Sequence, residues 1–411
     1  MNFDVVVIGG GPAGMMAAAR AGELGARVLL LEKNPTLGKK LLITGGGRCN
    51  ILHAEFDAHR LIAKYGKRGQ ALHSTFAQFG AQEAWDFFES RGLKLKIEAD
   101  QRAFPKSDKA ANVLDVLVRA LKKNNVTIQT DCTVKRIESD GSLIKKVIHT
   151  SGQITAKNFI LATGGKSRPE TGSTGDGFAW LRELGHKITE PSAALVPVII
   201  SNAWAKDLAG ISLQGVKLTL WQEHTRHESH TGKMLFTGTG LSGPLVLNMS
   251  KRIGELLEEG PVTVALDLFP SLDGGALDRK LVEIFGQSKN KLIKNHIGLI
   301  TKPRLAHAIL LLAGIDPATP LHQLTRSHRL AFGKILKHLP MNITGLLGTD
   351  KAVVTGGGID LKELDFKTMR SKKYTNLYLT GDILDFDRPS GGFSLQICWS
   401  TGFVAGSSAA A

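Results

Sequence analysis

The chain has 411 residues, 42% of them hydrophobic, which is long enough for about two or three domains with cores of their own. Its 52 lysines and arginines exceed its 37 aspartates and glutamates by 15, and this excess favours an anionic partner such as a nucleic acid. Three cysteines cannot make a disulfide framework, and we find neither a signal peptide nor an apolar run long enough for a membrane span. A cytoplasmic protein without membrane association is expected.

The first predicted element is a strand over residues 4–8, where a short β-branched run is typical of a buried parallel strand. It leads into the pattern Gly9-x-Gly11-x-x-Gly14, after which three alanines favour a helix. In this pattern the first glycine allows a tight turn, the second lets the backbone approach a pyrophosphate, and the third lets helix and strand pack closely. The start of the helix then offers free N–H groups to the phosphates.

A second strand is predicted over residues 28–31 and ends at Glu32, 18 residues after Gly14. The carboxylate can accept both hydroxyls of an adenosine ribose, whereas it would repel a 2′-phosphate. The glycine pattern alone is weak evidence in a chain with 46 glycines, and a turn without a ligand is the alternative. Because strand, helix and acid all stand in their expected places, an adenosine diphosphate site is predicted.

Another glycine-rich stretch covers residues 38–50. Its three consecutive glycines, residues 45–47, make a poor helix or strand and a good anion cradle. Arg48 could add a charge-assisted contact. A flexible loop is the alternative.

Helices and strands follow with ordinary periodicity. Residues 57–92 are predicted to be helical, with aromatic residues on one face that favours a core position over a stacking surface. A further helix is expected next, with Ser107 or Asp108 as its N-cap. Residues 126–133 and 143–150 predict strands.

The second strong signal is the stretch over residues 158–165. A buried strand ends there in Ala162, Thr163 and Gly164. This is the form that a sheet takes where a nucleotide crosses its carboxyl edge. A polar loop over residues 167–177 follows.

The composition changes near residue 191. Strand-like runs over residues 195–200, 213–221 and 262–268 are separated by turns and indicate a small β-rich insert of barrel type. Residues 276–340 then predict short helices.

These helices are strongly basic. Residues 286–340 carry nine lysines and arginines against one acid, which accounts for 8 of the 15 excess charges. These charges can form a solvated basic face, which is the alternative, but electrostatic binding of phosphate groups is the simpler interpretation. The residues predicted to bind RNA are Lys289, Lys291, Lys294, Arg326 and Arg329.

The last part of the chain returns to α/β character. A strand over residues 377–380 ends in Gly381 and Asp382, and an acid there can hold the ribityl hydroxyls of a flavin. Residues 388–396 open a final helix, whose first N–H groups could support the negative charge of a reduced flavin.

Three stretches are predicted to contact a nucleotide: residues 9–32, 162–165 and 381–382. A single FAD bound along one sheet edge would contact all three, whereas an NAD-dependent dehydrogenase without flavin explains only the first. Because no second strand–GxGxxG–helix unit is found, NAD(P)H is expected to dock transiently as the reductant. No metal site is predicted. The predicted FAD contacts are Gly9, Gly11, Pro12, Ala13, Gly14, Glu32, Lys33, Lys40, Gly46, Gly47, Arg48, Asn50, Ala162, Thr163, Gly164, Gly381, Asp382, Gly391, Gly392 and Phe393.

The expected fold class is α/β, with a Rossmann-like FAD-binding domain built from both chain ends. This domain is expected to comprise residues 1–190 and 343–411. It carries a β-rich, barrel-like insert over residues 191–272 and a basic helical insert over residues 273–342.

Several motifs carry a resemblance to one family over essentially the whole chain. They are the glycine fingerprint, GKKLLITGGGRCN, FPKSDKA, SRPETGSTGDGFAW, MLFTGTGLSGP, AVVTGGG and LYLTGDILDFDRPSGGFSLQ. Together they resemble the BaiN/RdsA family of FAD-dependent, NAD(P)-linked oxidoreductases. The resemblance implies either reduction of a uridine of 23S ribosomal RNA to dihydrouridine, as in RdsA-type members, or work on bile-acid C=C bonds, as in BaiN-type members. The basic helices favour RNA.

Reduction of the C5=C6 bond of uracil needs a hydride at C6 and a proton at C5. A thiol is a suitable acid, and Cys49 in the glycine-rich stretch is the predicted catalytic residue. A small buried residue is the alternative for Cys49, and Cys398 is expected to pack in the last helix. The uridine must be unstacked to react.

Three functions stay open at this point. The first is an rRNA dihydrouridine synthase, and the second is a flavin-dependent reductase or desaturase of a small apolar molecule. The third is a flavin-bearing RNA-binding protein without turnover. Salt-sensitive RNA binding separates the second from the others, and RNA-dependent NAD(P)H oxidation separates the first from the third. No stable protein partner is inferred.

Overall fold

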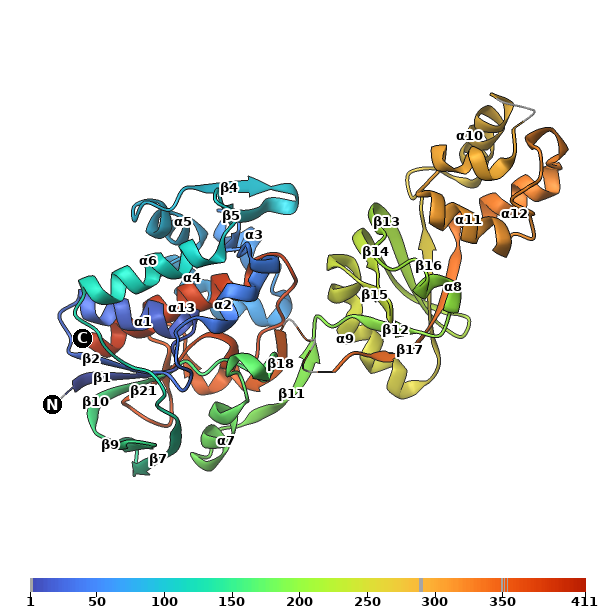
Figure 1. The fold of residues 1–411 in the computed structure, drawn as a ribbon. Coiled ribbons are helices and arrows are strands. Elements are labelled where there is room, and N and C mark those ends of the chain that lie inside the picture. The colour runs from blue at the N-terminus through green and yellow to red at the C-terminus, as the bar shows by residue number, and fades with distance from the viewer. Residues whose placement is uncertain (1–2, 288–290, 349, 351, 353) are drawn as a thin grey trace. The chain divides into compact units, whose positions relative to one another are not determined.

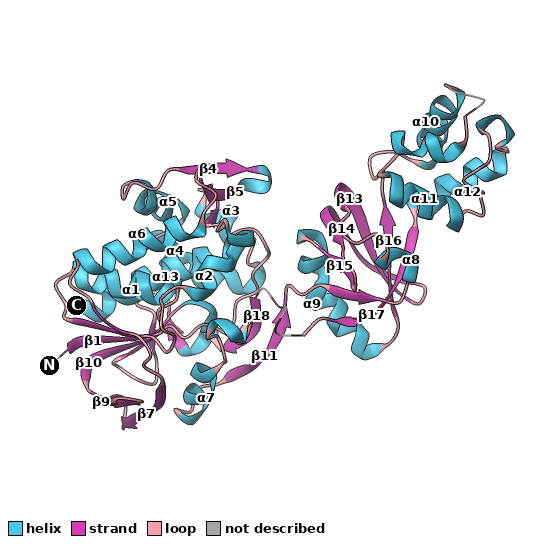
Figure 2. Cartoon of the chain, viewed as in Figure 1, coloured by secondary structure: helices cyan, strands magenta, loops and turns pink. Residues whose placement is uncertain are grey.

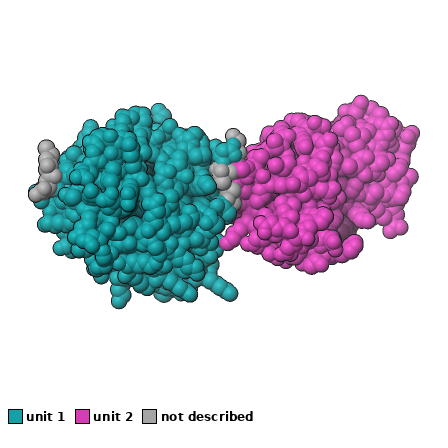
Figure 3. All heavy atoms as spheres, turned by 90° about the horizontal axis from the view of Figure 1, so that it is seen from below, with its two compact units in different colours: residues 1–194, 349–411 teal, residues 195–348 magenta. Residues whose placement is uncertain are grey.

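The computed structural model describes residues 3–287, 291–348, 350, 352 and 354–411 (Figure 1). The chain divides into two compact units (Figure 3). Unit 1 contains residues 1–194 and 349–411, so it is built from both ends of the chain, and unit 2 contains residues 195–348. Each unit has a hydrophobic core of its own.

The centre of unit 1 is a seven-stranded sheet with the order β19-β20-β21-β10-β1-β2-β6. Its strands β1 and β10 are labelled in Figure 2. The strands from β21 to β6 run parallel, and β19 and β20 add an antiparallel edge. Val5, Val6 and Val7 of β1 are fully buried, as a parallel strand covered on both faces requires. The bounds are β1 (Phe3–Ile8), β2 (Val28–Leu31), β6 (Thr127–Gln129), β10 (Ala156–Leu161), β19 (Leu364–Asp365), β20 (Arg370–Ser371) and β21 (Leu377–Leu379).

Two helices from opposite ends of the chain pack together against this sheet, α1 (Pro12–Glu23) and α13 (Phe393–Ala410). Glycine permits their close approach. A Cβ atom on Gly402 would lie 2.5 Å from the carbonyl oxygen of Ala13, and one on Gly406 would lie 2.3 Å from that of Ala17. The C-terminal helix is therefore part of the core around the first helix.

The segment predicted as helical over residues 57–92 is broken into shorter helices. Phe76, Phe79 and Phe88 are buried in the core of unit 1, as their spacing predicts. These shorter helices are α3 (Ala58–Ala63), α4 (His73–Gln78) and α5 (Ala81–Glu89). Unit 1 also contains α2 (Lys39–Ile43), α6 (Ala110–Lys123) and α7 (Asp176–Glu183).

The predicted N-cap of α6 is wrong. The helix begins after Lys109, and no side chain caps it. The Asp108 carboxylate instead accepts hydrogen bonds from Lys96 at 2.7 Å and from Arg48 at 2.6 Å. Two charged donors outcompete the backbone N–H groups of the helix for this carboxylate.

Three small sheets complete unit 1. One has the order β3-β5-β4, another has the order β7-β8-β9, and β11 pairs antiparallel with β18 next to the chain segments that enter and leave unit 2. The predicted strand over residues 126–133 is shorter than expected, because the chain turns after β6 and starts β7. The bounds are β3 (Leu52–His53), β4 (Leu95–Glu98), β5 (Arg102–Pro105), β7 (Val134–Asp140), β8 (Leu143–His149), β9 (Gly152–Ile154), β11 (Ile188–Ala194) and β18 (Val354–Ile359).

Unit 2 is a closed barrel with the order β12-β15-β14-β13-β16-β17. Among the described residues, the helices α10, α11 and α12 lie between β16 and β17 in the sequence. The bounds are β12 (Val198–Ile200), α8 (Ala203–Lys206), β13 (Ser212–Gln222), β14 (Thr225–Phe236), β15 (Gly240–Ser242), α9 (Pro244–Glu259), β16 (Val262–Asp267), α10 (Gly274–Gly286), α11 (Pro303–Leu312), α12 (Arg326–Lys337) and β17 (Leu339–Leu346). The predicted α/β fold, with a Rossmann-type domain from both chain ends and an inserted barrel, is confirmed.

In the parts of the chain that the structure describes, no helix is both long enough and apolar enough to cross a membrane. Within the same residues, no group of three or more histidine, cysteine or acidic side chains is arranged to hold a metal ion.

Candidate functional site

A cavity lies in unit 1 where β1, β2 and β10 reach their carboxyl ends. Its walls include residues from all three stretches predicted to hold the cofactor: the glycine fingerprint, residues 162–164 and Asp382. In open parallel sheets, ligands bind at this edge. The sheet thus brings together segments that lie hundreds of residues apart in the sequence.

The three fingerprint glycines meet three different steric demands. A Cβ atom on Gly9, whose φ is +108°, would lie 2.4 Å from the carbonyl oxygen of Ala162, and one on Gly14 would lie 1.9 Å from that of Gly9. Around Gly11 no described atom lies within 4 Å of such a Cβ, and Gly11 lines the cavity. The backbone is therefore open to a ligand at Gly11, beside Pro12 and Ala13 of the cavity wall.

Glu32 is held by hydrogen bonds at the end of β2. Its Oε2 accepts the backbone N–H of Gly10 at 2.7 Å, and its Oε1 accepts both the backbone N–H and the side-chain amide of Asn34, at 2.8 and 2.7 Å. Glu32 lines the cavity and is only 8% exposed. Oε2, which accepts a single hydrogen bond from the protein, keeps acceptor capacity for a ribose hydroxyl.

A loop over residues 167–176 lies against the residues that follow β2. Lys33 donates to the Thr174 hydroxyl at 2.6 Å and pairs with Asp176 at 2.7 Å. Asn34 donates to the carbonyl oxygen of Thr171 at 3.1 Å. Lys33 therefore lines the cavity with its charge bonded to this loop, which itself forms part of the cavity wall.

Lys40 of α2 lines another part of the wall. Its ammonium group donates to the Ser167 hydroxyl at 2.9 Å and lies 3.5 Å from the Ser173 hydroxyl and 3.8 Å from Asp382. Burial lowers the pKa of Lys40, and the neighbouring Asp382 carboxylate opposes that shift. The ammonium group of Lys40 and the carboxylate of Asp382 are therefore paired charges on the wall itself.

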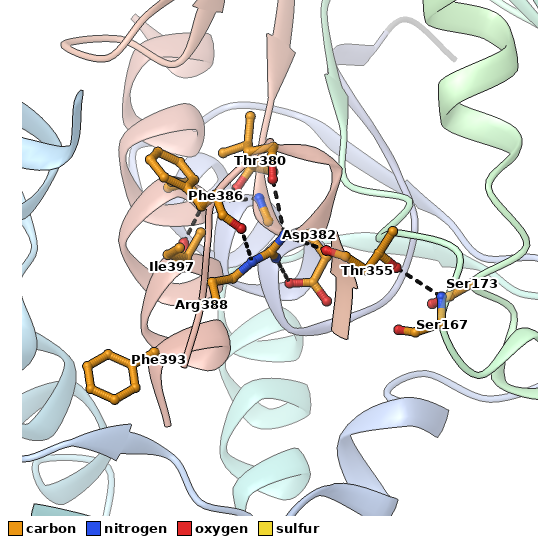
Figure 4. A network of polar contacts seen from close by, with 12 residues as sticks. Ser167, Ser173, Thr355, Thr380, Asp382, Phe386, Arg388, Phe393 and Ile397 are labelled. Atoms are coloured by element: carbon orange, nitrogen blue, oxygen red, sulfur yellow. Dashed lines mark hydrogen bonds and ion pairs between the residues drawn. The ribbon is translucent and has the colours of Figure 1, made fainter. Parts of the chain in front are cut away.

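Asp382 also accepts a hydrogen bond from Arg388, whose side chain is fully buried (Figure 4). Arg388 does not line the cavity, and it was not among the predicted site residues. Asp382 is thus paired with Arg388, which lies outside the cavity wall, and with Lys40, which is part of the wall.

Thr163 lines the cavity, and its buried hydroxyl has no hydrogen-bond partner among the described residues. Such a group is costly unless a ligand or water satisfies it. Ala162 and Gly164 line the same wall. The orphaned hydroxyl, the open backbone at Gly11 and the held carboxylate of Glu32 together fit the polar groups of FAD.

Four predicted contacts in the glycine-rich stretch, Gly46, Gly47, Arg48 and Asn50, are not part of the described cavity wall. Arg48 pairs with Glu98 at 2.5 Å and with Asp108 at 2.6 Å, and its guanidinium carbon lies 4.2 Å from the centroid of the Phe104 ring. From the stretch over residues 38–50 the cavity is lined instead by Gly38, Lys39, Lys40, Leu41 and Thr44.

The start of α13 reaches the cavity through Ser394 and Leu395. Gly381, Gly391, Gly392 and Phe393 lie beside the wall without lining it. A Cβ on Gly392, whose φ is +99°, would lie 2.3 Å from the carbonyl carbon of Leu52, so this glycine permits close packing. The Phe393 ring stacks on His53 with the centroids 4.5 Å apart.

The three cysteines are all buried, but they differ in their relation to the cavity. Cys49 is not in the cavity wall, and burial raises the pKa of its thiol to about 12. Cys398 and Cys132 line the cavity, and burial raises the pKa of both thiols. The Sγ atom of Cys132 lies 3.1 Å from Nδ1 of His149. Cys398 is therefore a second candidate proton donor beside Cys49.

The predicted RNA contacts lie in unit 2. Lys291, Lys294 and Arg326 are exposed. Arg329 is partly buried and forms a bidentate pair with Asp278, at 2.7 and 3.2 Å. Lys289 lies outside the described residues. A phosphate would meet the three exposed cations directly, whereas it would compete with a carboxylate for Arg329.

Sequence reasoning missed two residues of the cavity wall, Asn34 and Ser173. It also missed Ser167, Thr355 and Arg388, which support the wall without lining it. Arg388 is only six residues from Asp382, but an arginine in a polar loop does not reveal its partner. Thr355 lies almost two hundred residues from the N–H groups that it accepts. A contact over such a separation leaves no local pattern.

Comparison with known proteins gives a family match over nearly the whole chain. The model of the HI0933-like protein Rossmann domain matches residues 3–408. The chain is 31% identical over 408 residues to the 3-dehydro-bile acid delta(4,6)-reductase of Clostridium scindens, covering 98% of each chain. It is 29% identical over 412 residues to the ribosomal RNA dihydrouridine synthase of Escherichia coli K12, covering 98% of this chain and 97% of that protein.

Solved structures of flavoenzymes have a similar fold. A 3-ketosteroid-Δ4-(5α)-dehydrogenase from Rhodococcus jostii RHA1 aligns with a TM-score of 0.55 at 15% identity, over 100% of this chain and 97% of that one. The open conformation of a flavocytochrome c3 fumarate reductase aligns with a TM-score of 0.53 at 18% identity, over 100% and 78%. At these identities the likeness concerns the fold alone.

Proposed function

The chain belongs to the HI0933-like Rossmann family, and from this premise we propose that it is an FAD-dependent oxidoreductase that reduces a C=C bond with NAD(P)H as electron source. The cavity supports the cofactor assignment, because its wall combines an open glycine turn at a helix start, a buried acid after β2 and an orphaned threonine hydroxyl. Bound FAD would supply the hydride acceptor and donor.

The residues proposed to hold FAD have distinct roles. Gly11, Pro12 and Ala13 would receive the pyrophosphate at the start of α1, where N–H groups are free. Glu32 would accept the ribose hydroxyls, and Asp382 would accept hydroxyls of the ribityl chain. Gly9 and Gly14 would act through backbone packing.

The proposed substrate is a uridine of 23S ribosomal RNA. The observation that carries this choice is the charge of residues 286–340, with nine lysines and arginines against one acid. Anionic RNA fits this surface better than a small apolar molecule does. The 29% identity to a ribosomal RNA dihydrouridine synthase over nearly the whole chain agrees with it. Such a substrate would place the enzyme in the cytoplasm.

Reduction of the uracil C5=C6 bond balances with one hydride at C6 and one proton at C5. FAD held by the cavity residues would supply the hydride, and NAD(P)H would be the electron source and would leave as NAD(P)+. The proton must come from an acid of this chain or from water, and Cys49 and Cys398 are the proposed donors. A thiol whose pKa lies above neutral stays protonated, so either cysteine holds the proton that the reaction needs.

A second candidate substrate is a small apolar molecule with a C=C bond conjugated to a carbonyl. The 31% identity to a bile-acid reductase favours it. Both substrates share the same bond chemistry, so the fold does not separate them.

The deciding experiment follows the oxidation of NAD(P)H by the purified holoenzyme with three additions. These are 23S rRNA transcribed in vitro, tRNA of the same mass concentration, and a 3-oxo-Δ4 steroid. Oxidation that depends on rRNA, with a uridine heavier by two hydrogens in mass mapping, is the expected result. Turnover with the steroid alone would assign the second function, and RNA binding without turnover would leave a flavin-bearing RNA-binding protein.

A further inference from the structure

Arg388 is a charged side chain with no exposed surface. Its guanidinium group donates to the carbonyl oxygens of Thr355 at 3.2 Å, Leu384 at 3.1 Å and Phe386 at 3.2 Å, and it pairs with Asp382. A buried cation is tolerated only when it is paired and hydrogen-bonded, and here all three nitrogens have acceptors. Through these hydrogen bonds Arg388 connects the Asp382 carboxylate to the backbone at Thr355 and to the backbone of residues 384–386.

Arg388 belongs to a closed series of polar contacts beside the cavity wall, which we call the circuit. Its members are Arg388, Asp382, Lys40, Ser167 and Thr355. The Thr355 hydroxyl accepts the backbone N–H groups of Lys166 at 2.7 Å and Ser167 at 3.0 Å. The Ser167 hydroxyl in turn accepts a hydrogen bond from Lys40, which lies 3.8 Å from Asp382. Figure 4 shows the Arg388 guanidinium beside both Asp382 and Thr355, with Ser167 and Ser173 on the far side of Thr355.

Only two of the side chains in this circuit, Lys40 and Asp382, carry charge on the cavity wall itself. Neither could hold the other in place, because their 3.8 Å separation is longer than a hydrogen bond. Arg388 supplies the rigid anchor, since a planar guanidinium group reaches several acceptors at fixed angles.

We propose that Arg388 is a positioning residue for the cofactor site. It holds the Asp382 carboxylate toward the cavity and couples it, through Thr355 and Ser167, to Lys40. This inference rests on the proposed function, because it assumes that Asp382 contacts bound FAD.

The test is a double-mutant cycle on the affinity for FAD. Apoprotein carrying Arg388→Met, Asp382→Asn or both is titrated with FAD by fluorescence quenching, well below the melting temperature of each variant. Each single variant should bind FAD about 10- to 100-fold more weakly, as expected for losing a hydrogen bond to a charged group. The double variant should be no weaker than the weaker single one, because both changes disable the same carboxylate. Arg388→Lys should keep part of the affinity that Arg388→Met loses.

Arg68→Met is the matched control. Arg68 pairs with Asp385, a buried carboxylate in the same loop that is not in the cavity wall. This variant should lower the melting temperature but change the affinity for FAD by less than about twofold, since Arg68 does not bond to a residue of the cavity wall.

Several outcomes would overturn the proposal: wild-type affinity in Arg388→Met, additive losses in the double variant, or an equal loss in Arg68→Met. If Arg388→Met does not fold, the FAD affinities of Arg388→Lys and of the double variant, Arg388→Met with Asp382→Asn, are compared with that of Asp382→Asn instead. Neither of these variants leaves the Asp382 carboxylate without a partner. Failure of wild-type apoprotein to bind FAD would instead refute the proposed function.

Discussion

Oε2 of Glu32 accepts the backbone N–H of Gly10 at 2.7 Å, which joins the acid after β2 to the glycine turn after β1. The same carboxylate accepts two hydrogen bonds from Asn34. The acid is therefore oriented by the protein before any ribose binds. Preorganisation of this kind lowers the ordering cost of binding.

Glu32→Ala should weaken FAD binding by about 1.5–3 kcal/mol, the range for hydrogen bonds to a charged group. The dissociation constant, measured on apoprotein by fluorescence titration, should rise accordingly, and the released cofactor should be FAD and not FMN. Glu89→Ala is the control, because Glu89 accepts the N–H of Leu95 at 2.9 Å away from the cavity. Equal affinities for wild type and Glu32→Ala would contradict the ribose assignment.

Lys33→Met should speed FAD release. The substitution removes the contacts of Lys33 with Thr174 and Asp176, which hold the 167–176 loop against the residues after β2. Loss of a partly exposed ion pair of about 1 kcal/mol corresponds to about fivefold faster dissociation in stopped-flow exchange. Lys157→Met, which removes the exposed pair with Asp4, should leave the rate unchanged. A rate unaffected by Lys33→Met would mean that the loop does not limit release.

Replacing Lys291, Lys294 and Arg326 together with glutamine should weaken RNA binding and reduce its salt dependence. For each phosphate that the variant no longer neutralises, the slope of log affinity against log salt concentration should fall by about 0.7–0.9. Arg329→Gln is the informative comparison, since Arg329 already pairs with Asp278 and should contribute less to the slope. The flavin content should stay constant. A slope that does not change in the triple variant would identify these cations as a solvated face.

Cys49→Ala and Cys398→Ala separate the two proposed proton donors. Whichever thiol donates the proton, its removal should lower uridine reduction by about 10²–10⁴-fold while flavin reduction by NAD(P)H persists. The other variant should lose only the stability that a small cavity costs. Normal uridine reduction in both variants would assign the proton to water or to another side chain.

Burial of Cys49 also predicts an alkaline dependence of stability. Its folded-state pKa of about 12 lies above the ordinary thiol value of 9.0, so the folded state binds more protons in this interval. The contribution of the protonated Cys49 thiol to the free energy of unfolding is therefore complete below pH 9 and is lost as the pH rises toward 12. Urea unfolding at pH 7.5 and pH 10 should show a smaller pH-dependent loss for Cys49→Ala than for wild type.

The strongest sequence signals were those that depend on neighbouring residues. The strand over residues 4–8, the glycine turn and Glu32 predicted the first part of the sheet, because burial on both faces and a tight turn restrict residue types locally. The same reasoning found the strand ending at Ala162. Long-range pairing gave no such signal. Arg48 resembles an anion ligand in its own glycine-rich segment, yet Glu98 and Asp108, 50 and 60 residues away, neutralise it.

Tertiary packing partners also could not be predicted from local sequence patterns. The helical period over residues 57–92 found the buried aromatic residues but not the breaks between α3, α4 and α5. Cys49 was predicted as the catalytic residue from its place in a glycine-rich stretch, with a buried packing role as the alternative. The tertiary structure buries Cys49 and brings Cys398 to the cavity. A burial pattern set by distant elements cannot be read from the immediate neighbours of a residue.

The pairing of α1 with α13 has a consequence for biosynthesis. Strand β21, which neighbours β10 in the sheet, and the helix that packs on α1 both come from the last 35 residues of the chain. Both elements follow unit 2 in the sequence, whereas unit 2 is one continuous segment. The barrel unit can therefore fold while the chain is still being synthesised, and the cavity of unit 1 can close only after residues 377–411 have been made.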